Sequence, residues 1–312
     1  MIHIVHELAA LRELGPIVAA AGFFDGFHAG HQAVLAEAKR LAAEKNALPG
    51  VITFHPHPEV VLFPERPVRL LETEEEKERY MEEAGMAFAA VIRPTKNFLA
   101  EAAEDFLKDL AAVTGLRGFV CGENFTFGAG AAGGPAEIER YFAGTETAVR
   151  VVPMARSPAI GGRPVSSTEI RRLLSAGDVK TAALLLGRRY ALAGDVAHGF
   201  RRGTDAVGYP TANLAFPADR ALPADGVYAS FARVRGKRWP AVTNVGTNPT
   251  FGGAARTVET FVLDFDGSIY GEPFAVEFAE RLRGEIRFSG AEALAEQIGQ
   301  DIKRARQILA EG

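Results

Sequence analysis

Short apolar runs alternate with longer amphipathic stretches through the first half of the chain. The run at 16–22 is apolar throughout, which is typical of a strand buried on both faces. After it, Val34, Ala38, Leu41 and Ala42 recur at the spacing of a helix. Further apolar runs, separated by helical patterns, lie at 50–54, 87–92, 117–122 and 148–153. The alternation predicts a parallel sheet with right-handed crossovers.

The periodicity changes near residue 188. Short strand candidates then follow one another without a helical pattern between them, separated by clusters of Gly, Pro, Asn and Asp. They lie at 189–199, 211–216, 226–236, 239–246, 257–267 and 273–283, and an amphipathic helix at 291–310 ends the chain. We therefore predict an α/β chain of two domains. Residues 1–187 form a doubly wound parallel-sheet domain, and residues 188–312 form a small six-stranded antiparallel β-barrel with a terminal helix.

Composition narrows the class of protein. With 312 residues, 47% hydrophobic and 24% charged, the chain has the make-up of a globular protein with room for two cores. Its net charge of −4 and sequence pI near 6.0 argue against nucleic acid as a partner. A single cysteine, Cys121, excludes an internal disulfide and fits a reducing compartment. Because no apolar stretch is long enough for a membrane span and the N-terminus lacks the pattern of a secretion signal, we expect a cytoplasmic protein with no membrane partner.

The turn after the first strand, at 22–31, holds the first candidate site. In an open parallel sheet, ligands bind beyond the carboxyl ends of the strands, where helix N-termini point outward. The glycines of this turn allow close approach of a ligand, and the helix start offers unpaired N–H groups to an anion. His28 and His31, one helical turn apart, can direct two imidazoles at one phosphate and stabilise charge on a leaving group.

Two other interpretations of these histidines stay open. Either ring can cap the helix or pack under the turn. A metal centre is the other alternative, in which His28, His31, His55 and His57 converge with Asp25 as a carboxylate ligand. No cysteine or acidic cluster in the sequence completes such a ligand set.

A second candidate site lies in the segment P-V-S-S-T-E-I-R-R. Ser166 and Glu169 have the spacing of a capping box, which by itself would explain the serine. Ser167 and Thr168 add hydroxyl groups in the first turn, and Arg171 adds a guanidinium close by. Together these groups can hold a polyphosphate, so both the cap and the phosphate site stay open.

The second half contains no Walker motif, so a kinase there must hold ATP differently. Gly199, Gly203 and Gly208 would supply a loop that approaches a nucleotide closely. In P-T-A-N, Thr211 and Asn213 lie on one face of an extended segment and offer hard oxygen donors suited to Mg²⁺. A glycine-rich turn leading into a barrel strand is the alternative.

Glu259 is the candidate base of the second half. It alternates onto the strand face that also carries Phe261 and Leu263. A carboxylate among large apolar residues is costly to bury, and a buried one can act as a general base. An exposed strand glutamate is the alternative.

Several segments, taken together and in order, indicate a family. The motifs H-A-G-H and S-S-T-E-I-R resemble the elements with which nucleotidylyltransferases embrace the ATP triphosphate. From 22 to 190 the chain resembles the N-terminal domain of the bacterial bifunctional riboflavin kinase/FAD synthetase family. From 188 to about 301, with G-Y-P-T-A-N-L and V-E-T-F-V-L-D-F, it resembles the riboflavin kinase module. The resemblance implies an ATP-dependent transferase that phosphorylates riboflavin to FMN and then transfers AMP from ATP to FMN, giving FAD and pyrophosphate.

The resemblance also implies roles for individual residues of the first half. In adenylyl transfer, His28, His31 and Arg171 would steady the triphosphate, while Asn124 and His57 would lie near the flavin. The implied ATP-binding residues are Gly22, Phe24, Asp25, Gly30, Ser167 and Thr168.

In the second half, the resemblance implies that Glu259 takes the proton of the ribityl 5′-hydroxyl and that Thr211 and Asn213 bind Mg²⁺ with the ATP phosphates. It also implies a rigid turn near the flavin, at Asn248 and Thr250.

Two differences from the family pattern leave an alternative. Many relatives have an acidic residue at the position of Asn124, and an arginine in the loop that here reads G-A-G-A-A-G-G. A riboflavin kinase with a silent, flavin-binding N-terminal domain is therefore the second hypothesis. A flavin-sensing protein with neither activity is a third.

Overall fold

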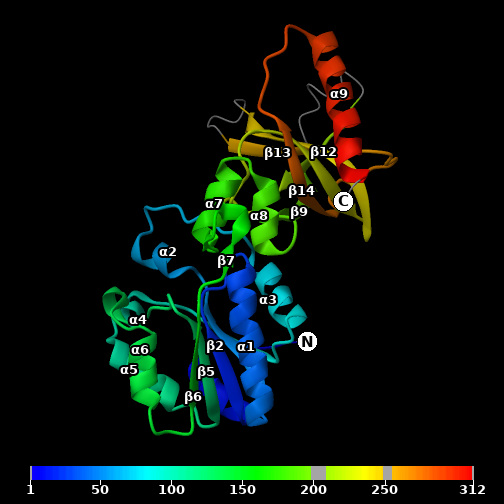
Figure 1. Ribbon diagram of the computed structural model, residues 1–312. Coiled ribbons are helices and arrows are strands. Elements are labelled where there is room, and N and C mark those ends of the chain that lie inside the picture. The colour runs from blue at the N-terminus through cyan, green and yellow to red at the C-terminus, as the bar shows by residue number, and fades with distance from the viewer. Residues whose placement is uncertain (1, 198–208, 249–254, 311–312) are drawn as a thin grey trace. The chain divides into compact units, whose positions relative to one another are not determined.

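The computed structural model describes residues 2–197, 209–248 and 255–310 (Figure 1). The chain divides into two compact units, Met1–Ser167 and Thr168–Gly312. This division falls after the first residue of helix α7 (Ser167–Ser175) and before helix α8 (Val179–Leu186), and α8 packs against a strand of the second unit. The predicted domain boundary lies after the two helices, at residue 187, and stays a prediction.

A six-stranded parallel sheet in the order β1-β4-β3-β2-β5-β6 forms the centre of the first unit. Its strands are β1 (His3–Val5), β2 (Ile17–Ala21), β3 (Leu48–Phe54), β4 (Phe88–Ile92), β5 (Leu116–Gly122) and β6 (Ala148–Val152). The predicted parallel sheet is thus confirmed. The edge strand β1 was not predicted, because three residues are too few to show a period.

Helices cover both faces of this sheet, which makes the unit doubly wound. On one face, α1 (Ala29–Lys45) buries Val34, Leu35, Ala38 and Leu41 against the strands. The core on the other face includes side chains of η1 (Leu8–Leu14), α5 (Ala103–Ala111) and α6 (Pro135–Phe142). Strands β2 and β4 are buried at every position, which explains their uninterrupted apolar sequence.

Further helices and a small hairpin complete the first unit. They are α2 (Pro58–Leu62), α3 (Glu74–Glu83), α4 (Lys96–Leu99), η2 (Ala129–Ala131), η3 (Pro158–Ile160) and the small hairpin of β7 (Arg156–Ser157) and β8 (Arg163–Pro164). Helix α3 begins with a capping box between Thr73 and Glu76, in which each side chain accepts from the other residue's backbone N–H.

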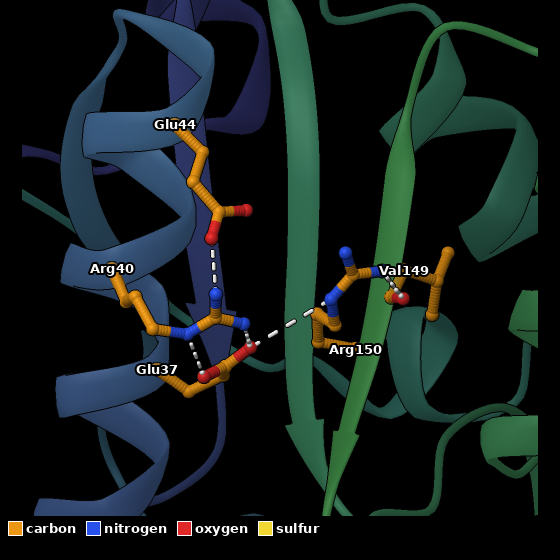
Figure 2. A network of polar contacts seen from close by, with 5 residues as sticks. All are labelled: Glu37, Arg40, Glu44, Val149 and Arg150. Carbon is orange, nitrogen blue, oxygen red and sulfur yellow. Dashed lines mark hydrogen bonds and ion pairs between the residues drawn. The ribbon is translucent and has the colours of Figure 1, made fainter.

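Charged side chains link α1 to β6 on the surface of the first unit (Figure 2). Arg40 donates to Glu37 at 2.5 and 2.8 Å and also contacts Glu44, while Arg150 of β6 lies 3.7 Å from Glu37. The hydrogen bond from Arg40 lowers the pKa of Glu37, and the charges of Arg40 and Arg150 add to this effect. Exposed pairs of this kind contribute little to stability, so apolar packing remains the main link between helix and sheet.

The second unit contains a closed six-stranded antiparallel barrel in the order β10-β13-β12-β11-β14-β9, as predicted. Its strands are β9 (Ala191–Ala197), β10 (Ala212–Ala215), β11 (Gly226–Val234), β12 (Lys237–Asn248), β13 (Ala255–Val262) and β14 (Pro273–Arg283). The terminal helix α9 (Ala291–Ala310) packs against β11, β12 and β14 (Figure 1).

Alternation along the barrel strands separates two faces. Val227, Ala229 and Phe231 belong to an outer cluster that includes Ala305 and Leu309 of α9. The opposite face carries fully buried side chains, among them a chain of hydroxyls across β11, β12 and β13. In this chain Ser230 Oγ lies 2.7 Å from Thr243 Oγ1, which lies 3.0 Å from Thr260 Oγ1. No helix in the described parts of the chain is both long and apolar enough to cross a membrane.

A substitution at Gly194 tests the close packing of β9 against β10, which closes the barrel. A Cβ atom at this position in β9 would lie 1.7 Å from the carbonyl oxygen of Ala215 in β10, so Gly194→Ala must push the two strands apart. We expect it to lower the free energy of unfolding by about 1–3 kcal/mol. Gly299→Ala is the control, because this helical glycine is exposed and has open space around it. It should raise stability by about 1 kcal/mol. Denaturant unfolding compares them, and equal stabilities would contradict the packing described.

Candidate functional site

The turn between β2 and α1 is compact and adopts left-handed backbone conformations. Phe24, Gly26 and Phe27 have φ of 58°, 94° and 41°, and both phenylalanines are buried. A Cβ at Gly22 would come within 3.1 Å of the Phe24 ring, and one at Gly30 within 3.2 Å of the His28 ring. The two glycines therefore allow bulky rings to pack directly against the backbone of the turn.

The two histidines of H-A-G-H lie together at the start of α1. His28 is the N-cap residue, since its Nδ1 accepts from the backbone N–H of His31 at 3.4 Å. The two rings stack with centroids 3.7 Å apart and planes inclined by 19°. The capping interpretation of His28 is therefore confirmed, and the same geometry brings both imidazoles to one place beside a helix N-terminus.

His31 is held in its neutral form. Its Nδ1 atom is buried and has no hydrogen-bond partner among the residues that the structure describes. Burial lowers the pKa of His31 well below its usual value, and the charges of His28 and Lys77 lower it further. A neutral imidazole carries one donor and one acceptor nitrogen, so this ring can donate a hydrogen bond to an anion without being a cation.

A buried charged cluster supports the same turn. Lys77 of α3 is buried with Asp25 and Glu72. Burial lowers the pKa of Lys77, while the charges of nearby carboxylates, Asp25 first, oppose the shift. Asp25 Oδ1 accepts from the N–H of Leu71 at 2.8 Å, and Glu72 Oε2 accepts from that of Gly26 at 3.2 Å. The segment 71–72 is thereby fastened to the turn.

The sequence did not predict this cluster. Lys77 and Glu72 belong to the stretch E-T-E-E-E-K-E-R-Y-M-E-E, whose many charges are typical of a solvated helix face. Lys77 and the apolar Met81 are four residues apart, a spacing that puts both on one face of the helix and that signals an inward-pointing lysine.

The second predicted phosphate element meets the first at Ser167. Its hydroxyl donates to the backbone oxygen of Asp25 at 2.7 Å, which joins the S-S-T segment to the turn that carries the histidines. Thr168 and Arg171 lie on α7 in the second unit. Their approach to a triphosphate stays a prediction.

The remaining predicted residues of the first unit occupy separate places. His57 caps α2 by accepting from the N–H of Glu59 at 3.1 Å, and its ring meets that of Phe23 edge-on at 4.2 Å. His55 pairs with Glu74 at 3.2 Å, and Asn124 is exposed after β5. Within the described residues, no group of three or more His, Cys, Asp or Glu side chains is arranged to hold a metal ion.

A cavity of about 580 Å³ lies in the second unit, between the outer face of the barrel and the region where α9 begins. Its apolar lining includes Tyr209, Val227, Val242, Phe261, Leu294 and Ile298. Its polar lining includes Thr211, Asn244, Glu259, Arg283, Glu285 and Asp301. Apolar walls with a few converging polar groups are typical of small-molecule sites.

Glu259 faces this cavity and is half-buried, so the interpretation as an exposed strand residue is wrong. In the barrel register it lies opposite Asn213 on one side and Asn244 on the other, and directly paired residues share a face. Removal from water raises the pKa of Glu259 above the ordinary glutamate value. The arrangement places a carboxylate of increased basicity at the wall of an apolar cavity.

Three predicted glycines, Gly199, Gly203 and Gly208, lie outside the described residues, as does Thr250. Asn248 is the last residue of β12. The predicted roles of these residues in binding ATP and flavin stay predictions.

Comparisons with known proteins match both units. A family model for FAD synthetase matches residues 11–169, and one for riboflavin kinase matches residues 186–309. A bifunctional riboflavin kinase/FMN adenylyltransferase of Listeria monocytogenes is 34% identical over 94% of this chain and 92% of its own length. The chain belongs to the bifunctional riboflavin kinase/FMN adenylyltransferase family.

Other members and a solved structure match over nearly the full length. The Bacillus subtilis relative of the same name is 33% identical over 97% of this chain and 96% of its own. A crystal structure from Streptococcus pneumoniae, described as a macrolide-efflux protein, superimposes with a TM-score of 0.88 at 29% identity, covering 97% of this chain and 98% of that one. The fold of the chain is thus similar to that of a solved structure.

The neutral state of His31 predicts a pH dependence of stability. In the unfolded chain the ring takes up a proton near pH 6.5, whereas in the folded chain it does so only at lower pH. Stability is therefore complete above pH 6.5 and falls below it, by up to about 1.4 kcal/mol per pH unit. In His31→Asn, the free energy of unfolding should decrease less between pH 7 and pH 5 than in the unsubstituted protein. His3→Asn, at an exposed position, should leave this decrease unchanged. Equal slopes for all three proteins in denaturant unfolding would contradict the assignment.

Proposed function

We propose that the two activities of this bifunctional enzyme occupy separate units. The enzyme phosphorylates riboflavin to FMN and adenylylates FMN to FAD, with ATP as the donor in both reactions. We assign the kinase to the cavity that contains Glu259 and the adenylyltransferase to the turn that contains His28 and His31. The observation that carries the assignment is Glu259, a desolvated carboxylate in a cavity within the segment that matches riboflavin kinase.

In the kinase, the isoalloxazine ring of riboflavin lies against the apolar wall of the cavity and the ribityl chain reaches Glu259. Glu259 accepts the proton of the ribityl 5′-hydroxyl. The hydroxyl oxygen forms a bond to the γ-phosphorus of ATP as the bond between that phosphorus and the leaving ADP breaks. The raised pKa of Glu259 favours this transfer, because a stronger base removes the proton more readily.

The oxygen donors beside Glu259 fit a Mg²⁺ ion, which we include in the proposal. Thr211 lines the same cavity, and Asn213 pairs directly with Glu259 in the register. Hydroxyl, amide and carboxylate oxygens are the ligands that Mg²⁺ prefers, and it keeps several of its sites for water and phosphate. Bound with ATP, the ion would neutralise charge on the phosphates.

In adenylyl transfer, a phosphate oxygen of FMN attacks the α-phosphorus of ATP and pyrophosphate leaves. No protein nucleophile is required, so catalysis consists of positioning and of stabilising negative charge. The N-terminus of α1 and the neutral ring of His31 supply donors for the phosphates, while Lys77 and Glu72 hold the turn in place. We include Ser167, which is hydrogen-bonded to the same turn, as a further phosphate contact, and the roles of Thr168 and Arg171 stay predictions.

The alternative of a silent first unit is not favoured. The FAD synthetase match extends through the H-A-G-H turn to Ser167 and Thr168, and Ser167 is hydrogen-bonded to Asp25 of that turn. A cytoplasmic location, expected from the sequence, is part of the proposal.

Glu259→Gln tests the kinase assignment. Without a base, FMN formation should fall by about 10²–10⁴-fold, while FAD formation from added FMN continues. Kinase activity of the unsubstituted enzyme should decline on acidification at a pH above the ordinary glutamate pKa, because Glu259 must be ionised to accept a proton. Glu280→Gln is the matched control, since this β14 glutamate pairs with Lys180 on the surface. If both reactions fell together in Glu259→Gln, the division between units would be wrong.

His28→Asn tests the adenylyltransferase assignment. Asparagine can still cap α1, so the fold is retained while the imidazole is lost. We expect FAD formation from FMN to slow by about 10–100-fold and FMN formation from riboflavin to continue unchanged. Chromatography of the flavins measures both. Unchanged FAD formation would leave His28 with the capping role alone.

A further inference from the structure

Helix α9 is fastened to the barrel by two arginine–aspartate pairs. Arg283, the last residue of β14, pairs with Asp301 of α9. Asp264, which follows β13, pairs with Arg306 of α9, in the helical turn after Asp301. Both pairs use two nitrogens of the guanidinium, yet they differ in surroundings. Asp301 is 6% exposed and lines the cavity, whereas Asp264 is 58% exposed and is not part of its lining.

The buried pair has the geometry of a strong interaction. Arg283 donates through Nε and Nη2 to the two carboxylate oxygens of Asp301 at 2.8 to 3.1 Å. Asp301 also accepts from Gln297 Nε2, one helical turn earlier, at 3.0 Å. Charge-assisted bidentate bonds are short and directional, so they define position as well as supplying energy. Loss of Arg283 would leave the buried Asp301 without its counterion, and loss of Asp301 would leave the half-buried Arg283 without one.

The pair also closes a loop whose residues form one wall of the cavity. Between Arg283 and Asp301 the chain passes through Ile286 and then enters α9, where Leu294 and Ile298 line the cavity. Leu294, Ile298 and Asp301 are spaced as neighbours on one face of the helix. Fixing Asp301 therefore fixes the rotation of the apolar side chains that line the same cavity as Glu259.

We propose that Arg283 and Asp301 are positioning residues for the flavin substrate: their ion pair holds the α9 wall of the cavity in the orientation that binds riboflavin. This inference rests on the proposed kinase function of the second unit. The pair does not take part in the transfer of the proton or the phosphoryl group. Its effect is therefore on riboflavin affinity, and the chemical step and ATP binding are little affected.

Asp301→Asn and Arg283→Met test the pair in the full chain. Each should raise the KM for riboflavin, and the Kd measured by quenching of riboflavin fluorescence, by about tenfold. The KM for ATP and the kcat should stay within about twofold, since a local change in the wall leaves Glu259 in place. In the double variant the KM should be no higher than in the more severe single variant, because the two residues act as one unit.

The exposed pair supplies the matched control. Asp264→Asn and Arg306→Met remove an arginine–aspartate pair from the same helix, outside the lining of the cavity. Their riboflavin KM and Kd should stay within about twofold of the unsubstituted enzyme. Equal increases of the riboflavin KM and Kd in the two sets of variants would overturn the proposal. Riboflavin binding would then depend on any contact that anchors α9 and not on the Arg283–Asp301 pair in particular.

Folding and the parent proposal are checked separately. The thermal midpoint of each variant shows whether the second unit is folded. If a variant of the buried pair is unfolded, Arg283→Lys takes its place, because lysine keeps the positive charge but cannot form the two parallel hydrogen bonds of a guanidinium. An unchanged riboflavin Kd in a folded variant of the buried pair would overturn the inference. Failure of the unsubstituted enzyme to form FMN would overturn the proposed kinase function, and the fluorescence Kd would still decide whether the pair sets flavin affinity.

Discussion

Closure of the antiparallel ladder is the constraint on which the second unit depends. Once six short strands form a barrel, alternate residues must fill a narrow interior, and the others must face outward. Thr260 and Val258 are buried on the inner side, so Glu259 between them faces out. The outer face is apolar and needs a cover, which α9 provides over β11 and β12. The cavity lies where that cover meets the row of Asn213, Glu259 and Asn244.

In the first unit, the constraint is the position of the turn after β2, and buried charged residues hold that turn in place. Strand β2 is surrounded on both faces, so a ligand can approach only beyond its carboxyl end, at the turn before α1. That turn contains several left-handed residues and two stacked imidazoles, a conformation that local preferences do not stabilise. Contacts from Glu72, the charge of Lys77 and the hydroxyl of Ser167 hold it from outside. We infer that the cluster preorganises the proposed phosphate site at a cost in desolvation.

Periodicity was sufficient to predict what depends on burial alone. The buried strands, the change to short strands near 188, and the shared face of Glu259 and Phe261 all follow from which residues avoid water. Contacts between segments that are distant in the sequence could not be predicted from local patterns. Lys77 is buried beside Asp25 and Glu72, and no local pattern reveals that these three residues come together. The pairing of Arg283 with Asp301 depends on the path of the chain into α9, and the edge strand β1 gains its partners only in the folded sheet.

Separate sites for the two reactions can be tested most directly by mixing Glu259→Gln and His28→Asn proteins. Each alone should convert riboflavin to FAD slowly, the first for lack of FMN and the second for lack of adenylyl transfer. If each unit carries one complete site, the mixture should form FAD much faster than the sum of the two alone, because FMN made by one protein serves the other. A mixture no faster than that sum would contradict the division of activities between the units.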